Sequence, residues 1–492
     1  MNFNGRKIGF ASGGNLCYNR SVDMSPIAIV GISCRFAGAP NPGALWRAVT
    51  DGRSAISPFK EDVARPVGLP GVFPRPYPTH GGLLGHASDP DDLYSCVPRE
   101  QTFPRQINAG ENPDLYFAVR LAFDALADAG VRPRAHDPVR GTVRFGYAPP
   151  FTAADVNWLD HTLFVDQTIE ILRRYFHAPS ESMDDVRARL VDALPAAAPG
   201  AFLSGCGHRM ADWIAQECGF SGDATALDAG VFTGIAALEA AADDLRSGRA
   251  DIALAGALQP PLTREFLEGA AGEVLFSQSA ELVPFDRSAS GTIPGEGGAF
   301  FVLKRETDAL RDHDRVYALL RGFSFGRSPA DELLSAAADC AGVQVHAIRL
   351  VEADGSGVPE ADAEEAQAVC RLWGEHRPGG PLVGLGSVKG NIGHCFTAAA
   401  AAGVLKAAFA LHAKVLPPQV AAERPLDCLS NLSSPAYLLN TARPWITGDA
   451  NAPRCAAVLA RDFSGRGAAL VLGEERATAV SEKEGKEKRH GR

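Results

Sequence analysis

Apolar residues along this chain fall into short runs bounded by glycine, and this rhythm predicts alternating strands and helices. Residues 25–32 form one such run and end near Gly31, which predicts a buried strand. Residues 115–129 have helical spacing and are followed by Gly130, a common helix stop. The pattern is that of an α/β protein.

The middle of the chain carries the clearest strand–helix–strand unit. Residues 225–229 predict a strand, residues 231–246 a helix that ends at Ser247-Gly248, and residues 250–257 a second buried strand. The sharp turn between the first strand and the helix falls at Asp228-Ala229-Gly230.

A similar rhythm recurs later in the chain. Residues 382–387 predict a strand, and residues 396–413 predict a helix after a glycine-rich turn. We therefore expect two related α/β halves, at residues 25–280 and 281–474.

Four segments do not follow the strand–helix pattern. We expect a loose extension at residues 1–23, a loop at 65–82, and a charged, solvated tail at 475–492. Residues 150–200 are polar and without regular pattern until a helical stretch at 183–194.

Composition places the chain among ordinary globular proteins. It has 492 residues, of which 46% are hydrophobic and 22% charged, with a net charge of −10. An acidic protein of this kind is a poor candidate for binding nucleic acid through a basic face.

Other simple classes of site also lack support in the sequence. The ten cysteines are spread without a CxxC pair, and no HExxH motif occurs, so no metal or cofactor is predicted. The start of the chain lacks the apolar run of a signal peptide, and the long apolar stretch at 397–416 predicts a buried helix and no membrane span. A reducing cytoplasm is the expected location.

Three long blocks, in order, resemble the β-ketoacyl synthases, the condensing enzymes of polyketide and fatty-acid assembly. They are SPIAIVGISCRFAGAPNPGALWRAVTDGRSAI at 25–56, PFDRSASGTIPGEGGAFFVLKR at 284–305 and GSVKGNIGHCFTAAAAAGVLKA at 386–407. The resemblance implies a thiolase-like fold, with two βαβαβ-containing halves stacked in layers, and a dimer. It also implies a reaction in which a cysteine takes up an acyl group as a thioester. Two histidines then assist decarboxylation of a malonyl unit and stabilise the enolate, whose carbon attacks the thioester.

The sequence departs from the family pattern where that chemistry is carried. The family's Asp-Thr-Ala-Cys-Ser-Ser turn is here Asp228-Ala229-Gly230-Val231-Phe232-Thr233, which puts Val231 at the nucleophile position. The family's Glu-Ala-His-Gly-Thr-Gly run is here Glu352-Ala353-Asp354-Gly355-Ser356-Gly357, which puts Asp354 at the first histidine position. A valine carries no acyl group, and an ionised aspartate accepts hydrogen bonds without donating any.

The late block keeps the family residues. Lys389 and His394 stand in their family positions, and Phe463 survives in a C-terminal loop that has lost most of its glycines. By resemblance, Phe463, Phe232 and Thr233 line the pocket or its gate.

The roles of three further residues depend on contacts that the sequence does not show. Cys395 is either a relocated nucleophile or a small packed side chain, and the second interpretation is favoured. His394 is either a hydrogen-bond donor in a pocket or a helix cap, and a pair with Asp354 would make it a general base. Glu296 is the expected ion-pair partner of Lys389 by resemblance.

Two functions follow from these residues. The favoured one is a non-condensing partner, similar to a chain-length factor, that pairs with an active synthase or with itself and works with an acyl carrier protein. By resemblance, the strand at 250–257 is its pairing edge. The alternative is an acyl-thioester decarboxylase or acyltransferase that uses His394 without a covalent intermediate. A scaffold that kept only the fold is a third, weaker possibility.

Overall fold

The computed structural model describes residues 25–60, 77–84, 112–132, 139–148, 153–176, 180–194, 205–376, 382–447 and 452–475. The predicted extension at 1–23, the loop prediction over 65–76 and the tail from 476 onward lie outside these residues. The boundary between the two predicted halves stays a prediction.

A mixed sheet of eleven strands runs through the described part of the chain, in the order β12-β10-β9-β14-β15-β8-β1-β7-β6-β4-β5. Its first group of strands is β1 (Ile27–Phe36), β4 (Gly141–Gly146), β5 (Ala224–Leu227), β6 (Ile252–Gln259) and β7 (Gly297–Arg305). The second group is β8 (Ala318–Gly326), β9 (Ile348–Glu352), β10 (Val383–Gly386), β12 (Ala436–Leu438), β14 (Cys455–Arg461) and β15 (Gly467–Gly473). The two groups join where the start of β1 pairs with β8.

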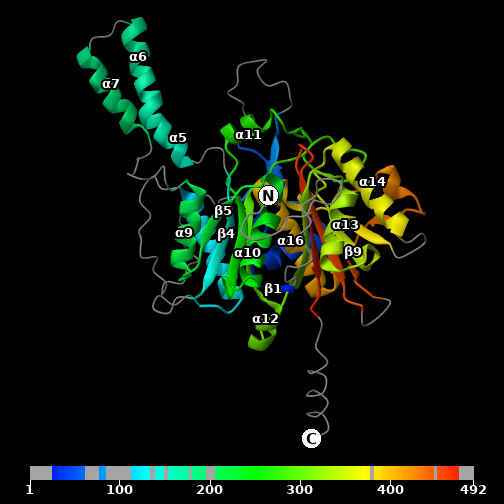
Figure 1. The fold of residues 1–492 in the computed structure, drawn as a ribbon. Helices are drawn as coiled ribbons and strands as arrows, with labels where there is room; N and C mark the ends of the chain where they lie inside the picture. Colours follow the sequence, from blue (N-terminus) through cyan, green and yellow to red (C-terminus); the bar gives the residue numbers. More distant parts are fainter. Residues whose placement is uncertain are drawn as a thin grey trace.

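Helices cover both groups of strands and fill the space between them (Figure 1). The outer helices on the first group are α4 (Pro113–Asp128) and α9 (Gly207–Glu217), and those on the second group are α13 (Ala330–Ala341) and α14 (Pro359–His376). Between the groups lie α10 (Thr233–Arg246) and α16 (Phe396–Ala413). This layered α/β arrangement is the thiolase-like fold that the resemblance implied.

Shorter elements connect the layers. The short helices are α1 (Pro42–Thr50), α11 (Arg264–Ala270), α12 (Glu306–Asp312), α15 (Lys389–Ile392) and α17 (Asp427–Ser430), with a 3-10 turn at Val345–Ala347. The short strands are β2 (Ile56–Pro58), β3 (His80–Gly82), β11 (Val415–Leu416) and β13 (Arg443–Pro444). Part of the predicted 65–82 loop is therefore a strand, since β3 pairs with β2.

The central helix α16 explains the alanine run of the sequence. Small side chains let α10 approach closely, and a Cβ on Gly234 would lie 2.6 Å from the backbone nitrogen of Ala401. Within the described residues, α16 is the one helix long and apolar enough to cross a membrane by length and composition, and 78% of it is buried inside the protein. The prediction of a buried core helix at this position is confirmed.

The strand–helix–strand prediction around the sharp turn needs two corrections. The helix predicted from residue 231 begins with a 3-10 turn, Gly230–Phe232 (η3), and becomes α-helical only at Thr233. The strand predicted as a pairing edge is β6, which lies between β7 and β4 inside the sheet, because its backbone groups are used on both sides. The strand at this end of the sheet is β5.

Residues 150–200 are more helical than the sequence predicted. The described part forms α5 (Ala153–Leu159), a π-helical turn at Asp160–Phe164 (η2), α6 (Val165–Phe176) and α7 (Ser180–Asp192). These helices extend away from the layered body as an arm (Figure 1). A π-helical turn shifts the phase of the apolar positions, so the helical period was hidden in the sequence.

Candidate functional site

The turn at the nucleophile position has the expected sharp geometry. After β5, Gly230 adopts a left-handed φ of 60°, and Asp228 Oδ1 accepts a hydrogen bond of 3.0 Å from its N–H. Thr233 accepts a hydrogen bond of 2.8 Å from the N–H of Ala229 and donates one of 2.7 Å to the carbonyl of Gly230. Thr233 therefore fixes the turn. Val231 at its centre is buried in the core between the two groups of strands, where it presents only hydrocarbon.

Asp354 lies in the loop after β9, where Gly355 has a positive φ of 48°. The N–H groups of Asp354 and Gly355 each donate a hydrogen bond of 2.8 Å to the carboxylate of Glu365 on α14. Glu365 thus fixes the backbone of this loop. The Asp354 carboxylate takes no part in these bonds and binds a different partner.

The partner of Asp354 is Lys389, which enters from α15. Its ammonium lies 2.8 Å from Asp354 Oδ1 and donates a hydrogen bond of 2.5 Å to the Asp354 carbonyl. Both side chains are more than nine-tenths buried, at 5% and 9% exposure. The family's histidine and lysine positions are therefore joined here by a buried ion pair.

The expected pair between Lys389 and Glu296 is wrong. Glu296 accepts hydrogen bonds of 2.9 Å and 2.8 Å from the N–H groups of Leu84 and Leu262. Because those two backbone donors satisfy its carboxylate, Glu296 stabilises loops next to β7.

His394 is fully buried just before the start of α16. Its Nδ1 accepts a hydrogen bond of 3.0 Å from the N–H of Phe396, the first residue of that helix, so the interpretation as a helix cap is confirmed. An accepting Nδ1 in a neutral ring puts the proton on Nε2, and Nε2 has no hydrogen-bond partner among the described residues. The direct pair between His394 and Asp354 is wrong, because the Asp354 carboxylate is taken by Lys389.

Burial keeps His394 neutral. Desolvation, together with the nearby positive charge of Lys389, lowers the pKa of His394 to about 3, although Asp354 opposes the shift. At neutral pH this side chain is a hydrogen-bond donor through Nε2 and carries no charge. It can polarise an oxygen that lies within hydrogen-bond reach of Nε2, but it does not form a general base with Asp354.

The loop between β14 and β15 lies over the same region. Phe463 is 42% exposed, and its ring centroid is 6.2 Å from that of His394. The Asp462 carboxylate accepts hydrogen bonds from Ser464 and Arg466, including 2.9 Å bonds from each N–H. The Arg466 guanidinium in turn lies 5.9 Å from the ring centroid of Phe232. The predicted gate residues Phe463, in this loop, and Phe232, in η3, thus both adjoin the site, and the Asp462 side chain holds the loop that carries Phe463.

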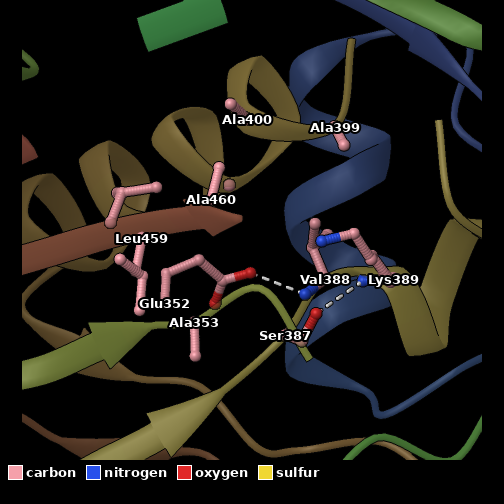
Figure 2. Close-up of a pocket in the computed structure, with 11 residues that line it drawn as sticks. Glu352, Ala353, Ser387, Val388, Lys389, Ala399, Ala400, Leu459 and Ala460 are labelled. Atoms are coloured by element: carbon pink, nitrogen blue, oxygen red, sulfur yellow. Dashed lines mark hydrogen bonds between the residues drawn. The ribbon is translucent and has the colours of Figure 1, made fainter. Parts of the chain in front are cut away.

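The cavity beside Lys389 is small (Figure 2). Its volume is about 10 Å³, which is room for a single water molecule. Polar groups of Glu352, Ser387 and Lys389 face the alanines of α16 and the end of β14 across this space. Glu352 is itself paired with Lys406 at 2.7 Å. The space between these residues does not hold an acyl chain.

Cys395 is a packed core side chain, as favoured from the sequence. It is fully buried, and its Sγ lies 3.6 Å from the Glu296 carbonyl. Burial raises the pKa of this thiol, and the charge of Glu296 adds to the rise. A thiol that stays protonated is a poor nucleophile.

Two groups of buried acids around the site were not predicted from the sequence. In the first group, Asp362 and Glu365, three residues apart on α14, bind backbone N–H groups of the loop that carries Asp354. Desolvation, opposed by hydrogen bonds and increased by the charge of Asp354, raises the pKa of Asp362 to about 7 and also raises that of Glu365. The i, i+3 spacing on a helix was visible in the sequence, but nothing there showed which loop the two acids would hold.

The second group lies near the sharp turn. Tyr147 donates a hydrogen bond of 2.7 Å to Asp114 and accepts one of 3.0 Å from Asn112. Desolvation raises the pKa of Asp114 to about 6. Asn112 and Asp114, at the start of α4, thus form a buried polar network with Tyr147, which follows β4.

Comparison with known proteins identifies the family. The β-ketoacyl synthase N-terminal domain matches residues 24–172 and 177–309, and the β-ketoacyl synthase C-terminal domain matches residues 326–423. The chain therefore belongs to the β-ketoacyl synthase family.

The curated relatives are polyketide synthases. The spectinabilin polyketide synthase system protein NorA' of Streptomyces orinoci is 31% identical over 93% of this chain. The pikromycin polyketide synthase component PikAII of Streptomyces venezuelae is 28% identical over 94% of it. The chain spans only 12% of the length of each of these two relatives.

Solved structures support the same fold. The ketosynthase from module 6 of the bacillaene synthase of Bacillus subtilis 168 has a TM-score of 0.71 at 23% identity, covering 92% of this chain and 72% of its own. A structure named PfaC Keto synthase-Chain length factor has a TM-score of 0.72 at 23% identity, covering 92% of this chain and 48% of its own.

Proposed function

We propose that this chain is a non-condensing partner, similar to a chain-length factor, of an active β-ketoacyl synthase in polyketide assembly. The observation that carries the proposal is the buried ion pair between Asp354 and Lys389 in a chain that has a valine at the nucleophile position. Val231 cannot form a thioester. Asp354 offers a negative charge where the reaction needs a hydrogen-bond donor beside a malonyl carboxylate.

The same pair supports a retained folding role. A neutral histidine at position 354 would give the buried Lys389 ammonium no negative charge, whereas Asp354 supplies a counter-ion at 2.8 Å. The site is thus consistent with a chain that has kept the fold and lost the reaction. Its partners are an active synthase, or a second copy, together with an acyl carrier protein in the cytoplasm.

The outer edge of β5 is the surface we assign to the synthase. It is the end of the sheet nearest the sharp turn, and its backbone groups pair on one side only, with β4, in the described part of the chain. A partner strand added there would place the two sharp turns near each other.

Co-expression with the condensing synthase encoded beside this chain tests the proposal. We expect the two to co-elute in size-exclusion chromatography, and we expect product length to change when this chain is left out. Intact-protein mass spectrometry after incubation with malonyl- and acyl-carrier proteins should show an acyl adduct on the synthase and none on this chain. An adduct here, or no effect on co-elution and product length, would overturn the proposal.

A second function is favoured by one observation, the unpartnered Nε2–H of His394 among the described residues. In this alternative the chain is a decarboxylase of a malonyl thioester, or an acyltransferase to an alcohol or amine. For the decarboxylase, the C–C bond breaks, carbon dioxide leaves, and the enolate oxygen accepts a hydrogen bond from His394 before the carbon takes a proton from water. Acetyl-carrier product formed by the purified wild type, and lost in His394→Ala, would favour this alternative. Equal rates for the two proteins would exclude a role for His394.

A further inference from the structure

The arm formed by α5, η2, α6 and α7 has a core of its own. Val165 and Ile169 on α6 pack with Met183 on α7, and partly buried side chains of both helices close this small cluster. On α6, the buried positions 165 and 169 and the partly buried position 172 repeat at helical spacing, so one stripe of α6 faces α7.

A second apolar stripe, formed by the last residue of η2 and two residues of α6, is exposed. Phe164, Ile171 and Tyr175 are 56%, 52% and 71% exposed, and their spacing of seven and four residues puts them on one face. This face lies about 100° around the helix from the stripe that packs on α7. Of the ten large apolar side chains exposed in the described residues, six lie on the arm, with Trp158, Leu163 and Phe176 as the others. Such a concentration marks an interaction surface.

The charges along α6 indicate what covers this surface. Asp166 and Glu170 lie toward the N-terminal end of the helix, Arg173 and Arg174 toward its C-terminal end, and all four are exposed. Asp166 is ion-paired with Arg187 of α7, so the acidic side chain of α6 that we assign to a second copy is Glu170. An antiparallel copy of the same helix brings each basic end beside an acidic end, whereas a parallel copy brings like charges together. The helix is thus complementary to itself about a two-fold axis.

We propose that two copies of this chain associate through their arms, with the exposed faces of α6 packed antiparallel. With the two-fold axis near Ile171, Glu170 of each copy lies beside Arg174 of the other. The arm contact uses side chains of α6, on the arm that extends from the body (Figure 1), whereas the contact assigned to the synthase uses the backbone of β5, so each proposal can fail without the other.

Sedimentation velocity of the full chain over a range of concentrations tests the arm contact. Ile171→Glu buries a charge at the centre of the interface and should abolish the arm-dependent association. Glu170→Arg places arginine beside arginine twice and should weaken association about 10-fold. The double variant Glu170→Arg/Arg174→Glu exchanges the two charges and should restore wild-type association.

Controls separate this surface from the rest of the molecule. Leu432→Ser removes an apolar side chain away from the arm that is even more exposed than Ile171, and it should leave association unchanged. A circular dichroism melt should show that each variant is folded. Identical concentration dependence for wild type and Ile171→Glu would overturn the proposal, as would a wild type without self-association or a charge exchange that does not restore it.

Two further measurements identify the alternatives. If the arm binds a membrane instead, the wild type will sediment with phosphatidylcholine–phosphatidylglycerol vesicles and Ile171→Glu will not, which overturns the self-association proposal. Co-elution of Ile171→Glu with the synthase tests whether synthase pairing depends on the arm. Its retention would show that an arm defect leaves synthase pairing intact.

Discussion

At the scale of single residues, the two departures from the family are of different kinds. Val231 replaces a reactive group by a packed one and leaves its neighbours undisturbed in the core. Asp354 replaces a neutral ring by a charge, and that charge forms a contact of 2.8 Å with Lys389. The valine removes a function, whereas the aspartate creates a new structural dependence, since a buried charge needs its partner.

This dependence predicts the effect of restoring the family residue. Asp354→His should destabilise the protein by about 3 kcal/mol, because it leaves the buried Lys389 ammonium without a counter-ion. Urea unfolding followed by fluorescence measures the loss. Asp354→His/Lys389→Met should recover much of it, and Asp354→Asn should cost less because its carbonyl oxygen still accepts from Lys389. Wild-type stability in Asp354→His would contradict the view that the pair stabilises the fold.

His394 makes stability depend on pH. Its pKa is about 3 in the folded protein and about 6.5 in an unfolded chain, so between these values only the unfolded chain binds the proton. Stability therefore falls as pH falls from 6.5 toward 3, with a slope from this residue of about 1.4 kcal/mol per pH unit.

His394→Gln should remove that part of the slope, which urea unfolding at pH 4.5 to 8 can measure. Above pH 7 the difference in unfolding free energy between the two proteins should be constant, and this range serves as the internal control. A wild-type slope in the variant below pH 6 would mean that His394 is protonated in the folded protein.

At the scale of elements, the crossing of α10 and α16 depends on small residues. A Cβ on Gly234 would lie 2.6 Å from the Ala401 nitrogen and 2.9 Å from its Cβ, and backbone cannot move aside as a side chain can. Gly234→Ala should therefore cost about 1–3 kcal/mol of unfolding free energy.

Gly269→Ala on α11 is the matched control for Gly234→Ala. No atom lies within 4 Å of a Cβ placed there, so this variant should be neutral or up to about 1 kcal/mol more stable. Urea midpoints of both variants measured together would separate close packing from helix propensity. Equal effects of the two substitutions would contradict the proposed close approach.

The elements that were predicted well are those whose bounds and burial are specified by residues within the element or next to it. The helix at 396–413 was predicted with its observed bounds, because an alanine run bounded by Cys395 and Lys414 specifies both its length and its burial. Of the arm, the helical stretch predicted at 183–194 matches most of α7, whereas α5 and α6 were missed, since the π-helical turn at 160–164 breaks the periodicity between them. The edge strand was assigned to 250–257 by resemblance, and the order of strands in a sheet depends on pairings that no local pattern shows.

The candidate site shows the same division between local and distant contacts. Sequence alone identified Val231, Asp354, Lys389 and His394 as positions of interest. It did not pair Lys389 with Asp354, which lie 35 residues apart, and it chose Glu296 instead. The sequence showed that Lys389 needs an acidic partner, but not which acid it binds. That depends on whether backbone N–H groups already satisfy one of the two carboxylates, as they do for Glu296.

At the scale of the whole molecule, stability is unevenly distributed. The layered body has large clusters of fully buried side chains on both faces of its strands, and α10 and α16 lie within the central one. The arm has a separate cluster in which, among the described residues, Val165, Ile169 and Met183 are buried. The free energy of local unfolding is set by the contacts that a segment makes. The arm should therefore unfold locally while the body stays folded.

Hydrogen exchange followed by mass spectrometry measures this difference directly. Amides of α6 and α7 should exchange at least about 100-fold faster than those of α10 and α16 in dilute protein, since the arm buries far less apolar surface. Raising the protein concentration should slow exchange in α6 and leave α10 unchanged if the arms pair. Equal protection of arm and body at every concentration would mean that the arm is held by contacts with the body, and the self-association of α6 would lose its physical basis.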